Sequence, residues 1–190
     1  VFALRDMDDA ADGGKVKERY NGSGATVRGF NVEGRAAFTR WFELQAGVTL
    51  QQSRYKEPEF WSEDAEVPPV RRMFRTPDAY GYFTASFKPV RNFTADLSGT
   101  CTGSMLVQHM AGSGVAQDVA VSTPSFFDMN IRLSYDVRIY KEITMQLYGG
   151  VQNLFNAYQK DFDKGVDRDS GYIYGPSLPR SWFVGAKFSF

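Results

Sequence analysis

The chain has 190 residues, and its 22 lysines and arginines balance 22 aspartates and glutamates. Because these charges cancel, the chain has no basic field that would attract nucleic acid over long range. A single cysteine and a single histidine exclude a disulfide within the chain, a thiolate zinc cage and a multi-histidine metal site. No run approaches the roughly 18 apolar residues that a membrane-spanning helix needs.

Aromatic residues make up 15% of the chain although its mean hydropathy is −0.37, a combination that suits strands with one apolar face. Period-two alternation of apolar and polar residues predicts seven such strands. Residues 1–5 are expected to form the top of an eighth. The seven predicted strands cover residues 25–39, 42–51, 79–87, 93–101, 127–137, 143–151 and 180–190.

Each predicted strand has two unlike faces. We expect the apolar face to contact lipid and the polar face to line a lumen. A soluble lipid-binding barrel would alternate in the same way, with its apolar face inward, so alternation alone leaves both readings open. The residues expected to face lipid are Phe30, Leu44, Phe83, Leu97, Ile131, Leu147 and Val184, and those expected to face the lumen are Glu33, Arg35, Asp96 and Arg132.

The connections alternate in length. Short turns are predicted near residues 40, 89 and 139, and long polar segments at about 56–77, 104–124 and 157–179. Short turns at one end and long loops at the other are typical of outer-membrane barrels, with the short turns in the periplasm. The predicted fold is therefore all-β, an antiparallel up-and-down transmembrane barrel segment with its C-terminus in the periplasm.

Two stretches near the C-terminus resemble a known family. The end of the chain, "PRSWFVGAKFSF", resembles the strand that the barrel assembly machinery recognises, through Gly185, Phe188 and Phe190, although Phe183 stands where that pattern usually has a polar residue. Upstream, "GVQNLFNAYQKD" resembles the Asn-Leu-Phe-Asn motif of TonB-dependent receptors, and "GATVRGFNVEGRAAF" resembles an earlier strand of that family. The motif residues are Asn153, Leu154, Phe155 and Asn156.

The resemblance implies a barrel of about 22 strands that is closed by an N-terminal plug. Residues 1–190 are then expected to be the C-terminal part of the barrel domain, preceded by the plug and the earlier strands. The implied function is TonB-dependent uptake of a scarce nutrient across the bacterial outer membrane, first of all a ferric siderophore, with cobalamin, haem or a glycan as other cargoes. The implied partners are TonB through the N-terminal region, the barrel assembly machinery, outer-membrane lipid and lipopolysaccharide, and the small nutrient ligand.

Two other functions remain open at this stage. A complete small eight-stranded barrel would be an adhesin, a structural anchor or a lipid-modifying enzyme, and a soluble barrel would bind a small ligand. No enzyme activity and no cofactor are expected. The only histidine, His109, is predicted to be exposed in a loop, so neither a Ser-His-Asp triad nor a multi-histidine metal site is expected to form.

Three arginines and two aromatic residues in the segment at 56–77 are candidates for ligand binding. Arginines so close together would attract an anionic ligand such as a ferric siderophore, or lipopolysaccharide phosphates, unless they are simply solvated. Aromatic residues in a loop often contact a ligand, although packing against neighbouring loops is the alternative. These candidates are Arg71, Arg72, Arg75, Phe60 and Trp61.

Four aspartates lie within one predicted loop, "DFDKGVDRDSG". Carboxylate oxygens of this kind bind calcium, but the spacing differs from that of an EF-hand. The alternatives are therefore a weak calcium site and a solvated acidic loop, and no metal site is predicted outright. The four residues are Asp161, Asp163, Asp167 and Asp169.

Overall fold

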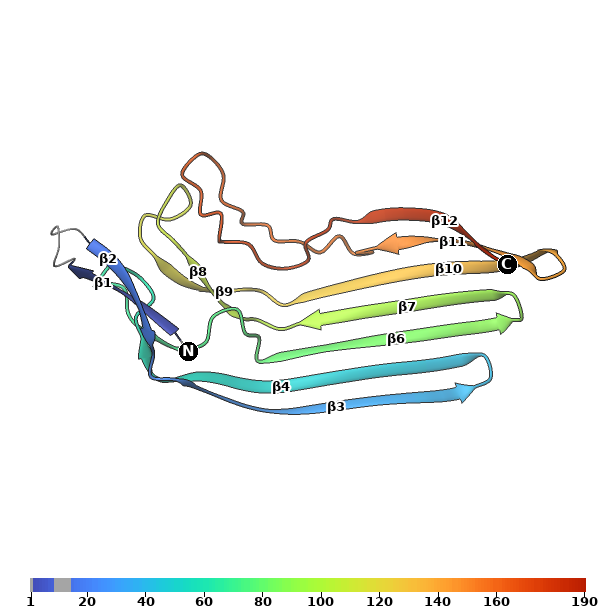
Figure 1. The fold of residues 1–190 in the computed structure, drawn as a ribbon, viewed down its shortest axis with the longest axis horizontal. Coiled ribbons are helices and arrows are strands. Elements are labelled where there is room, and N and C mark those ends of the chain that lie inside the picture. Colours follow the sequence, from blue (N-terminus) through green and yellow to red (C-terminus); the bar gives the residue numbers. More distant parts are fainter. Residues whose placement is uncertain (1, 9–14) are drawn as a thin grey trace.

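The computed structural model describes residues 2–8 and 15–190, and its regular elements in these residues are all strands. No helix in this part of the chain is long and apolar enough to cross a membrane. Seven long antiparallel strands lie side by side in the order β12-β11-β10-β7-β6-β4-β3 (Figure 1). They are β3 (Ala25–Thr39), β4 (Phe42–Glu59), β6 (Ala79–Val90), β7 (Phe93–Thr102), β10 (Phe126–Tyr140), β11 (Ile143–Gln152) and β12 (Ser181–Ser189).

The seven strands predicted from the sequence are confirmed, with small shifts at their ends. The strands β6 and β10 run on to Val90 and Tyr140, so two turns lie at residues 91–92 and 141–142 rather than near 89 and 139. The strand β4 continues well past residue 51, and its extension pairs with the short β5 (Val70–Arg72). Period-two patterns mark the central part of a strand better than its ends, because both ends lie in more polar surroundings.

Two hairpins lie outside the long strands. The strand β1 (Phe2–Asp8) pairs with β2 (Lys15–Asn21), which leads into β3. Residues 1–5 were expected to form the top of an eighth barrel strand; a strand is present from Phe2 onward, but it belongs to this separate two-stranded sheet and not to the long sheet, and Val1 lies outside the described residues. The strands β8 (Leu106–His109) and β9 (Val119–Ser122) form a second hairpin inside the segment predicted to be a loop. Four-residue strands are too short to produce a clear alternation, which explains why the sequence pattern missed them.

The hydrogen-bond register places the apolar residues of neighbouring strands opposite one another. Leu97 of β7, for example, pairs with Ala85 on one side and Ile131 on the other. Residues that pair in this way share a face of the sheet. The apolar row continues across all seven strands through Ala36, Leu44, Ala85, Leu97, Ile131, Val151 and Trp182.

The residues one position away form a polar row on the opposite face. Asp96 pairs with Ser86 and with Arg132, and Arg35 pairs with Gln45. The register therefore confirms that the residues predicted to face lipid and those predicted to face the lumen lie on opposite faces of the sheet.

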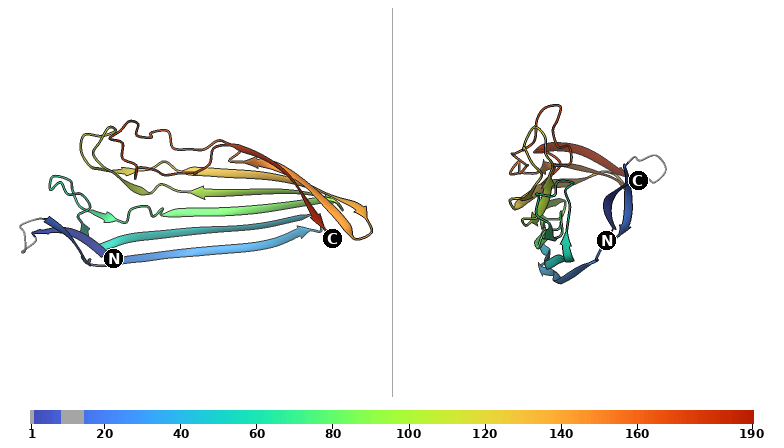
Figure 2. Two further views of the ribbon diagram at one scale, coloured as in Figure 1. Left: turned by 45° about the horizontal axis from the view of Figure 1, so that its top comes forward. Right: turned by 90° about the vertical axis from the view of Figure 1, so that its left-hand side faces the viewer.

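Large apolar side chains lie exposed on one face of the sheet, although Ala85 and Val151 on the same face are buried. Phe30 is 65% exposed and Val184 is 89% exposed, whereas the polar residues Ser53 and Ser134 are buried, with 1% and 7% of their surface exposed. The sheet is curved into a trough, as the end view in Figure 2 shows. Exposed apolar side chains gathered on one face in this way mark a surface for contact with another apolar surface.

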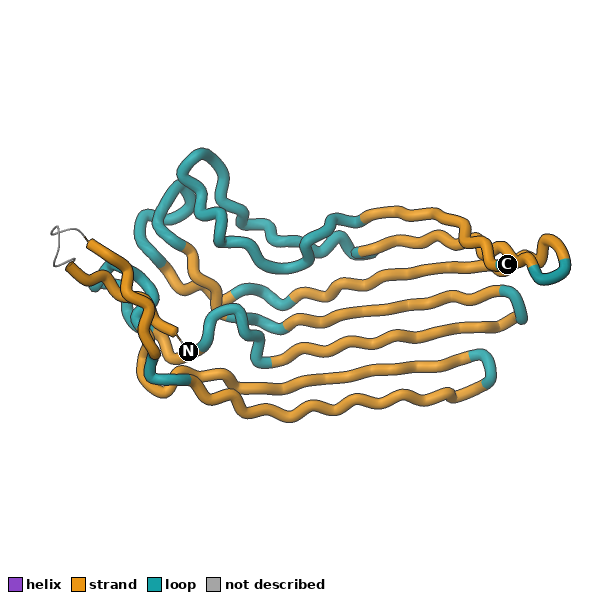
Figure 3. Tube along the Cα trace, viewed as in Figure 1, coloured by secondary structure: helices purple, strands orange, loops and turns teal. Residues whose placement is uncertain are grey.

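Short turns and long segments lie at opposite ends of the strands (Figure 3). The turns at residues 40–41, 91–92 and 141–142 lie at one end, together with the C-terminus. The long segments between β4 and β6, between β7 and β10, and between β11 and β12 lie at the other end. This arrangement confirms the alternation of connections expected from the sequence.

The sheet is open. Within the described residues, β12 pairs with β11 alone and β3 pairs with β4 alone, so each has one edge without a partner strand. This agrees with the open, curved sheet expected for part of a larger barrel, and it differs from a small barrel closed between its first and last strands.

Four aromatic rings lie over glycines on the neighbouring strand. A side chain on any of these glycines would collide with the ring, so glycine leaves the space that the ring fills. At Gly150 a Cβ would also collide with the main-chain oxygen of Ile131 in β10. The pairs are Tyr82 with Gly47, Phe83 with Gly99, Tyr148 with Gly185, and Phe183 with Gly150.

We expect Gly150→Ala to destabilise the sheet and Gly34→Ala to leave it unchanged. A Cβ at Gly150 meets backbone, which has no way to rotate aside, whereas a Cβ at Gly34 meets nothing within 4 Å. Overpacking of this kind costs about 1 to 3 kcal/mol. Urea unfolding of the folded protein, followed by tryptophan fluorescence, measures both variants, and equal stability of the two would show that β10 and β11 are not packed as described.

Candidate functional site

The polar face of the sheet carries a network of side chains that bind one another. Arg35 forms an ion pair with Glu43 on the neighbouring strand, and the amide of Gln45 donates to Glu33 at 2.8 Å. Further along the sheet, Arg132 donates to Gln146 at 3.2 Å. The face therefore offers both charges and hydrogen-bonding groups to whatever fills the trough.

At the loop end of the sheet, the long segments form a small apolar core. We call β8, β9 and residues 157–179 the loop cap. Its centre is Val107, fully buried, with Tyr172 at 2% and Tyr174 at 7% exposure. Met105, Val121 and Phe126 pack against this centre, so the loop cap is folded by its own hydrophobic contacts.

His109 lies in this core, and the prediction that it would be exposed in a loop is wrong. Its ring stacks on Tyr172 with centroids 3.7 Å apart and planes 5° from parallel. Its Nε2 lies 3.0 Å from each carboxylate oxygen of Asp163, and both side chains are nearly inaccessible, at 8% and 5% exposure. The hairpin turns His109 inward beside Val107, and residues 157–179 cover it, which no local pattern could indicate.

Asp161 and Asp163 are held ionised by donors from the loop cap. For Asp163, the hydrogen bond with His109 is the main cause that lowers its pKa, against a smaller effect of burial. Burial alone would raise the pKa of Asp161, but hydroxyl donation from Tyr174 at 2.5 Å and Tyr172 at 2.7 Å outweighs it, so this pKa is also lowered. Burial and Asp161 in turn raise the pKa of Tyr174 to about 12 and raise that of Tyr172 further.

The four candidate calcium ligands are not gathered around one point. The carboxylate of Asp169 accepts from the main-chain N–H groups of Met110 and Gly171, both at 2.8 Å, and Asp167 contributes its main-chain carbonyl to Ser113. Within residues 2–8 and 15–190, no group of three or more His, Cys, Asp or Glu side chains is placed to hold a metal. These aspartates bind the loop cap together.

The three candidate arginines have three separate sets of partners. Arg72 pairs with Asp78 at 3.1 Å and donates to the carbonyl of Ser104 at 2.8 Å. Arg75 donates to the carbonyls of Gly171 and Ile173, which joins its segment to the loop cap. The side chain of Arg71 is 60% exposed and lies 3.8 Å from Glu57, so it is the arginine with the most freedom to contact a ligand.

The two candidate aromatic residues also differ. The indole N–H of Trp61 donates to the carbonyl of Pro68 at 3.3 Å, and its ring meets Phe74 edge-on at 5.3 Å. Trp61 therefore packs within its own segment. Phe60 is 70% exposed and remains a candidate for ligand contact.

The two asparagines of the Asn-Leu-Phe-Asn motif, Asn153 and Asn156, hydrogen-bond to both ends of the last long segment, and we call them the clasp. Asn153 is 2% exposed and has φ 48°, a left-handed conformation that asparagine tolerates better than most residues. Its amide donates to the carbonyls of Ala157 and Leu178, both at 2.8 Å, and its side-chain oxygen accepts from the N–H of Ala157. Asn156 accepts from the N–H of Arg180 at 3.0 Å. The two asparagines thus join the start of this segment to its end.

The residues predicted to form an assembly signal lie in or directly after β12. Gly185 lies opposite Tyr148, whose ring fills the space above it. Phe188 is 52% exposed and Phe190 is 93% exposed. Their exposure is compatible with recognition by another protein, which stays a prediction.

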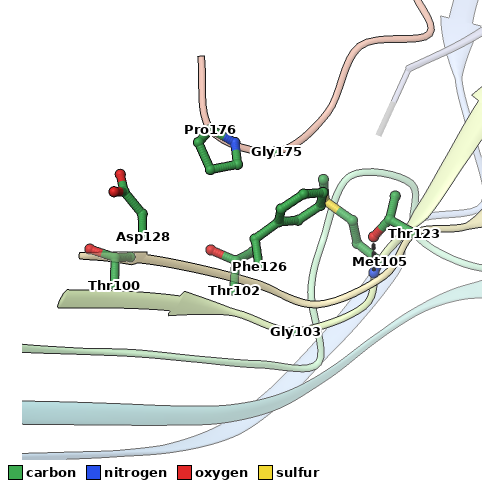
Figure 4. Close-up of a pocket in the computed structure, with 9 residues that line it drawn as sticks. All are labelled: Thr100, Thr102, Gly103, Met105, Thr123, Phe126, Asp128, Gly175 and Pro176. Atoms are coloured by element: carbon green, nitrogen blue, oxygen red, sulfur yellow. Dashed lines mark hydrogen bonds between the residues drawn. The ribbon is translucent and has the colours of Figure 1, made fainter. Parts of the chain in front are cut away.

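A pocket opens between the polar face and the loop cap, and the sequence had not indicated it (Figure 4). It has a volume of about 290 Å³. Asp128 of β10 points from the sheet toward residues 175–176, and its Oδ1 is buried without a hydrogen-bond partner. The other lining residues are Thr100, Thr102, Gly103, Met105, Thr123, Phe126, Gly175 and Pro176.

Acidification is expected to loosen the loop cap. Because the folded-state pKa values of Asp161 and Asp163 are lowered, the stability that they contribute is present above about pH 4, the ordinary aspartate value, and is lost as the pH falls through the lower folded values. Hydrogen–deuterium protection factors of residues 157–179 should therefore fall below about pH 4 while β6 and β7 stay protected.

Two substitutions test this assignment. Asp161→Asn should weaken the loop cap at neutral pH and reduce its response to acid, whereas Asp167→Asn should change neither, because that residue contributes its main-chain carbonyl to Ser113. Protection of residues 157–179 that is the same at neutral and acidic pH would contradict the assignment.

Asn153→Gly should destabilise the protein by about 1 to 3 kcal/mol, because the main-chain groups of Ala157 and Leu178 lose their buried partners. Glycine adopts the left-handed conformation at no steric cost, so the folded state loses the side-chain contacts alone, and the added freedom of the unfolded chain also occurs in the control variant. Asn92→Gly, at a turn where the main-chain carbonyl makes the contact, is the control and should change stability by less than about 0.5 kcal/mol. Equal losses in the free energy of unfolding for Asn153→Gly and Asn92→Gly, measured by urea unfolding, would refute this role of Asn153.

Comparison with known proteins supports the fold. No protein-family model matches the sequence, and no curated protein matches it either. Among solved structures, the chain is similar to the ferric-catecholate import receptor Fiu of E. coli K12 in its closed form, with a TM-score of 0.57 and 20% sequence identity. The similarity covers 94% of this chain and 22% of the receptor chain. The chain thus spans about a fifth of that receptor's length, and at this identity the likeness shows its fold, an antiparallel up-and-down sheet of the kind that forms a barrel segment.

Proposed function

We propose that this chain is the C-terminal part of the barrel domain of a TonB-dependent receptor in a bacterial outer membrane. The observation that carries the proposal is a continuous apolar row on one face of the sheet, with large apolar side chains such as Phe30 and Val184 exposed on that face, opposite a polar face. Lipid is the environment that accepts such an apolar face, and a closed barrel is the way in which strands satisfy their hydrogen bonds there. The fold shared with an import receptor supports the same proposal.

In this proposal the two open edges pair with strands from the preceding part of the protein. A strand edge in lipid would leave main-chain N–H and C=O groups without partners, at a cost of several kcal/mol for each group. The earlier strands would close the barrel between β3 and β12, and an N-terminal plug would occupy the trough. The short turns and the C-terminus would lie in the periplasm, with the loop cap outside the cell.

The proposed cargo is a ferric siderophore, and a ferric catecholate is the first to test because the similar structure is named for importing one. Ferric catecholates carry net negative charge, which a solvent-exposed guanidinium attracts. Arg71 and Phe60 are the residues that we propose for first contact, because both are exposed at the loop end. TonB, the assembly machinery, which would read Phe190, and lipopolysaccharide are the proposed protein and lipid partners.

Uptake in iron-limited cells tests the proposed function. Cells that rely on the full-length protein should accumulate radioactive iron from a ferric catecholate, and deletion of TonB should abolish that accumulation. Arg71→Ala should weaken binding of the anionic complex by about tenfold with normal surface expression, whereas Arg138→Ala, at the turn end of β10, should not. Accumulation that continues without TonB would refute active transport of this kind.

The lipid-facing assignment has its own test. Leu97→Arg and Ser98→Arg introduce the same charge at adjacent positions on opposite faces of β7. The first should cost about 2 to 4 kcal/mol near the middle of the bilayer, and the second should cost far less because its side chain lies on the polar face, away from lipid. Reversible unfolding from phospholipid vesicles measures the difference, and equal costs would place neither face in lipid.

A further inference from the structure

The pocket on the polar face contains a carboxylate for which the described residues supply no partner. Asp128 lies in β10 opposite Thr100 of β7, with its Oδ1 shielded from solvent and without a hydrogen bond. An ionised carboxylate loses solvation when it is shielded and is stabilised by a cation or by several donors. Its surroundings therefore favour the arrival of a group that the described part of the chain does not provide.

The neighbouring cation has its ion pair elsewhere, although its Nε is buried without a hydrogen-bond partner. Arg72 reaches the carbonyl of Ser104, beside the pocket residues Gly103 and Met105, but its ion pair is with Asp78 at 3.1 Å. Among the residues that line the pocket, Asp128 is the one charged side chain. The pocket thus has a negative charge of its own and no lining cation to neutralise it.

The remaining lining defines the kind of group that would fit. Hydroxyls of Thr100, Thr102 and Thr123 accept or donate hydrogen bonds, while Phe126 and Met105 offer apolar contact. An aromatic ring also attracts a cation that lies over its face. One carboxylate among neutral oxygens provides fewer charged ligands than calcium sites generally use, which favours an organic cation over a metal.

We propose that this pocket binds an aliphatic cationic group, an ammonium or guanidinium carried on an alkyl arm. Its volume of about 290 Å³ is many times the roughly 15 Å³ that one water needs on such a measure, so the arm enters with the charge. The group comes either from a diffusible ligand or from a side chain in another part of the protein. The inference rests on the pocket alone and does not require transport of iron.

Cysteine labelling of the purified, folded, full-length protein tests the proposal. The exposed Cys101 is first replaced by serine, and Thr102→Cys then places a thiol in the pocket. Three methanethiosulfonate reagents of similar size carry an ammonium, a hydroxyl or a sulfonate. We expect the ammonium reagent to react faster than the sulfonate reagent by about tenfold, relative to the same ratio at Thr94→Cys on the same face of β7.

Changes at Asp128 separate the outcomes. Asp128→Asn should remove the preference for the ammonium reagent at Thr102→Cys without affecting Thr94→Cys, and Asp128→Glu should retain it. Slow reaction with all three reagents that becomes fast in Asp128→Asn supports the proposal with the cation supplied by the protein itself. Where the pocket thiol reacts readily with Asp128 intact, an ammonium-to-sulfonate ratio equal to that at Thr94→Cys, or a neutral reagent as fast as the ammonium one, would overturn the proposal. A preference that survives Asp128→Asn, or a slow reaction that stays slow in Asp128→Asn, would overturn it as well.

Discussion

The hydrogen-bond register between neighbouring strands is the constraint on which the rest of this structure depends. Because side chains alternate between faces, a slip of one residue at any of the six strand pairings would turn an apolar row onto the polar face. Leu97 between Ala85 and Ile131, and Asp96 between Ser86 and Arg132, show both rows in their correct positions. The pattern of side chains and the register of the main chain therefore stabilise each other.

The single layer explains why the described residues form little core within the long sheet. A single curved layer has no second layer to bury its apolar face, and the exposed Phe30 and Val184 show the result. Hydrophobic burial takes place instead in the loop cap, around Val107 and Tyr172. The sheet is stabilised by the hydrogen bonds between its strands and by the surface that its apolar face contacts. The loop cap is stabilised by its own hydrophobic packing.

The clasp at Asn153 connects these two parts. Its main-chain N–H donates to the side chain of Asn130 in β10, and its side chain holds both ends of residues 157–178. The last long segment therefore leaves and re-enters the sheet at a defined place, and Gly175 comes to lie over the pocket that contains Asp128. A motif that resembles a family signature thus has a direct structural role here.

The sequence by itself determined the seven strands, their two faces and the alternation of short and long connections, because period two is a local property of each strand. Only the tertiary structure decided where particular polar side chains lie: His109 is buried against Asp163, the three arginines separate to different partners, and Asp128 of β10 lines a pocket. Several of these contacts join residues far apart in the chain, as those of Arg75 with Ile173 and of His109 with Asp163 do. Irregular segments have no sequence periodicity from which such contacts could be predicted. The positions of these segments depend on how they pack against one another.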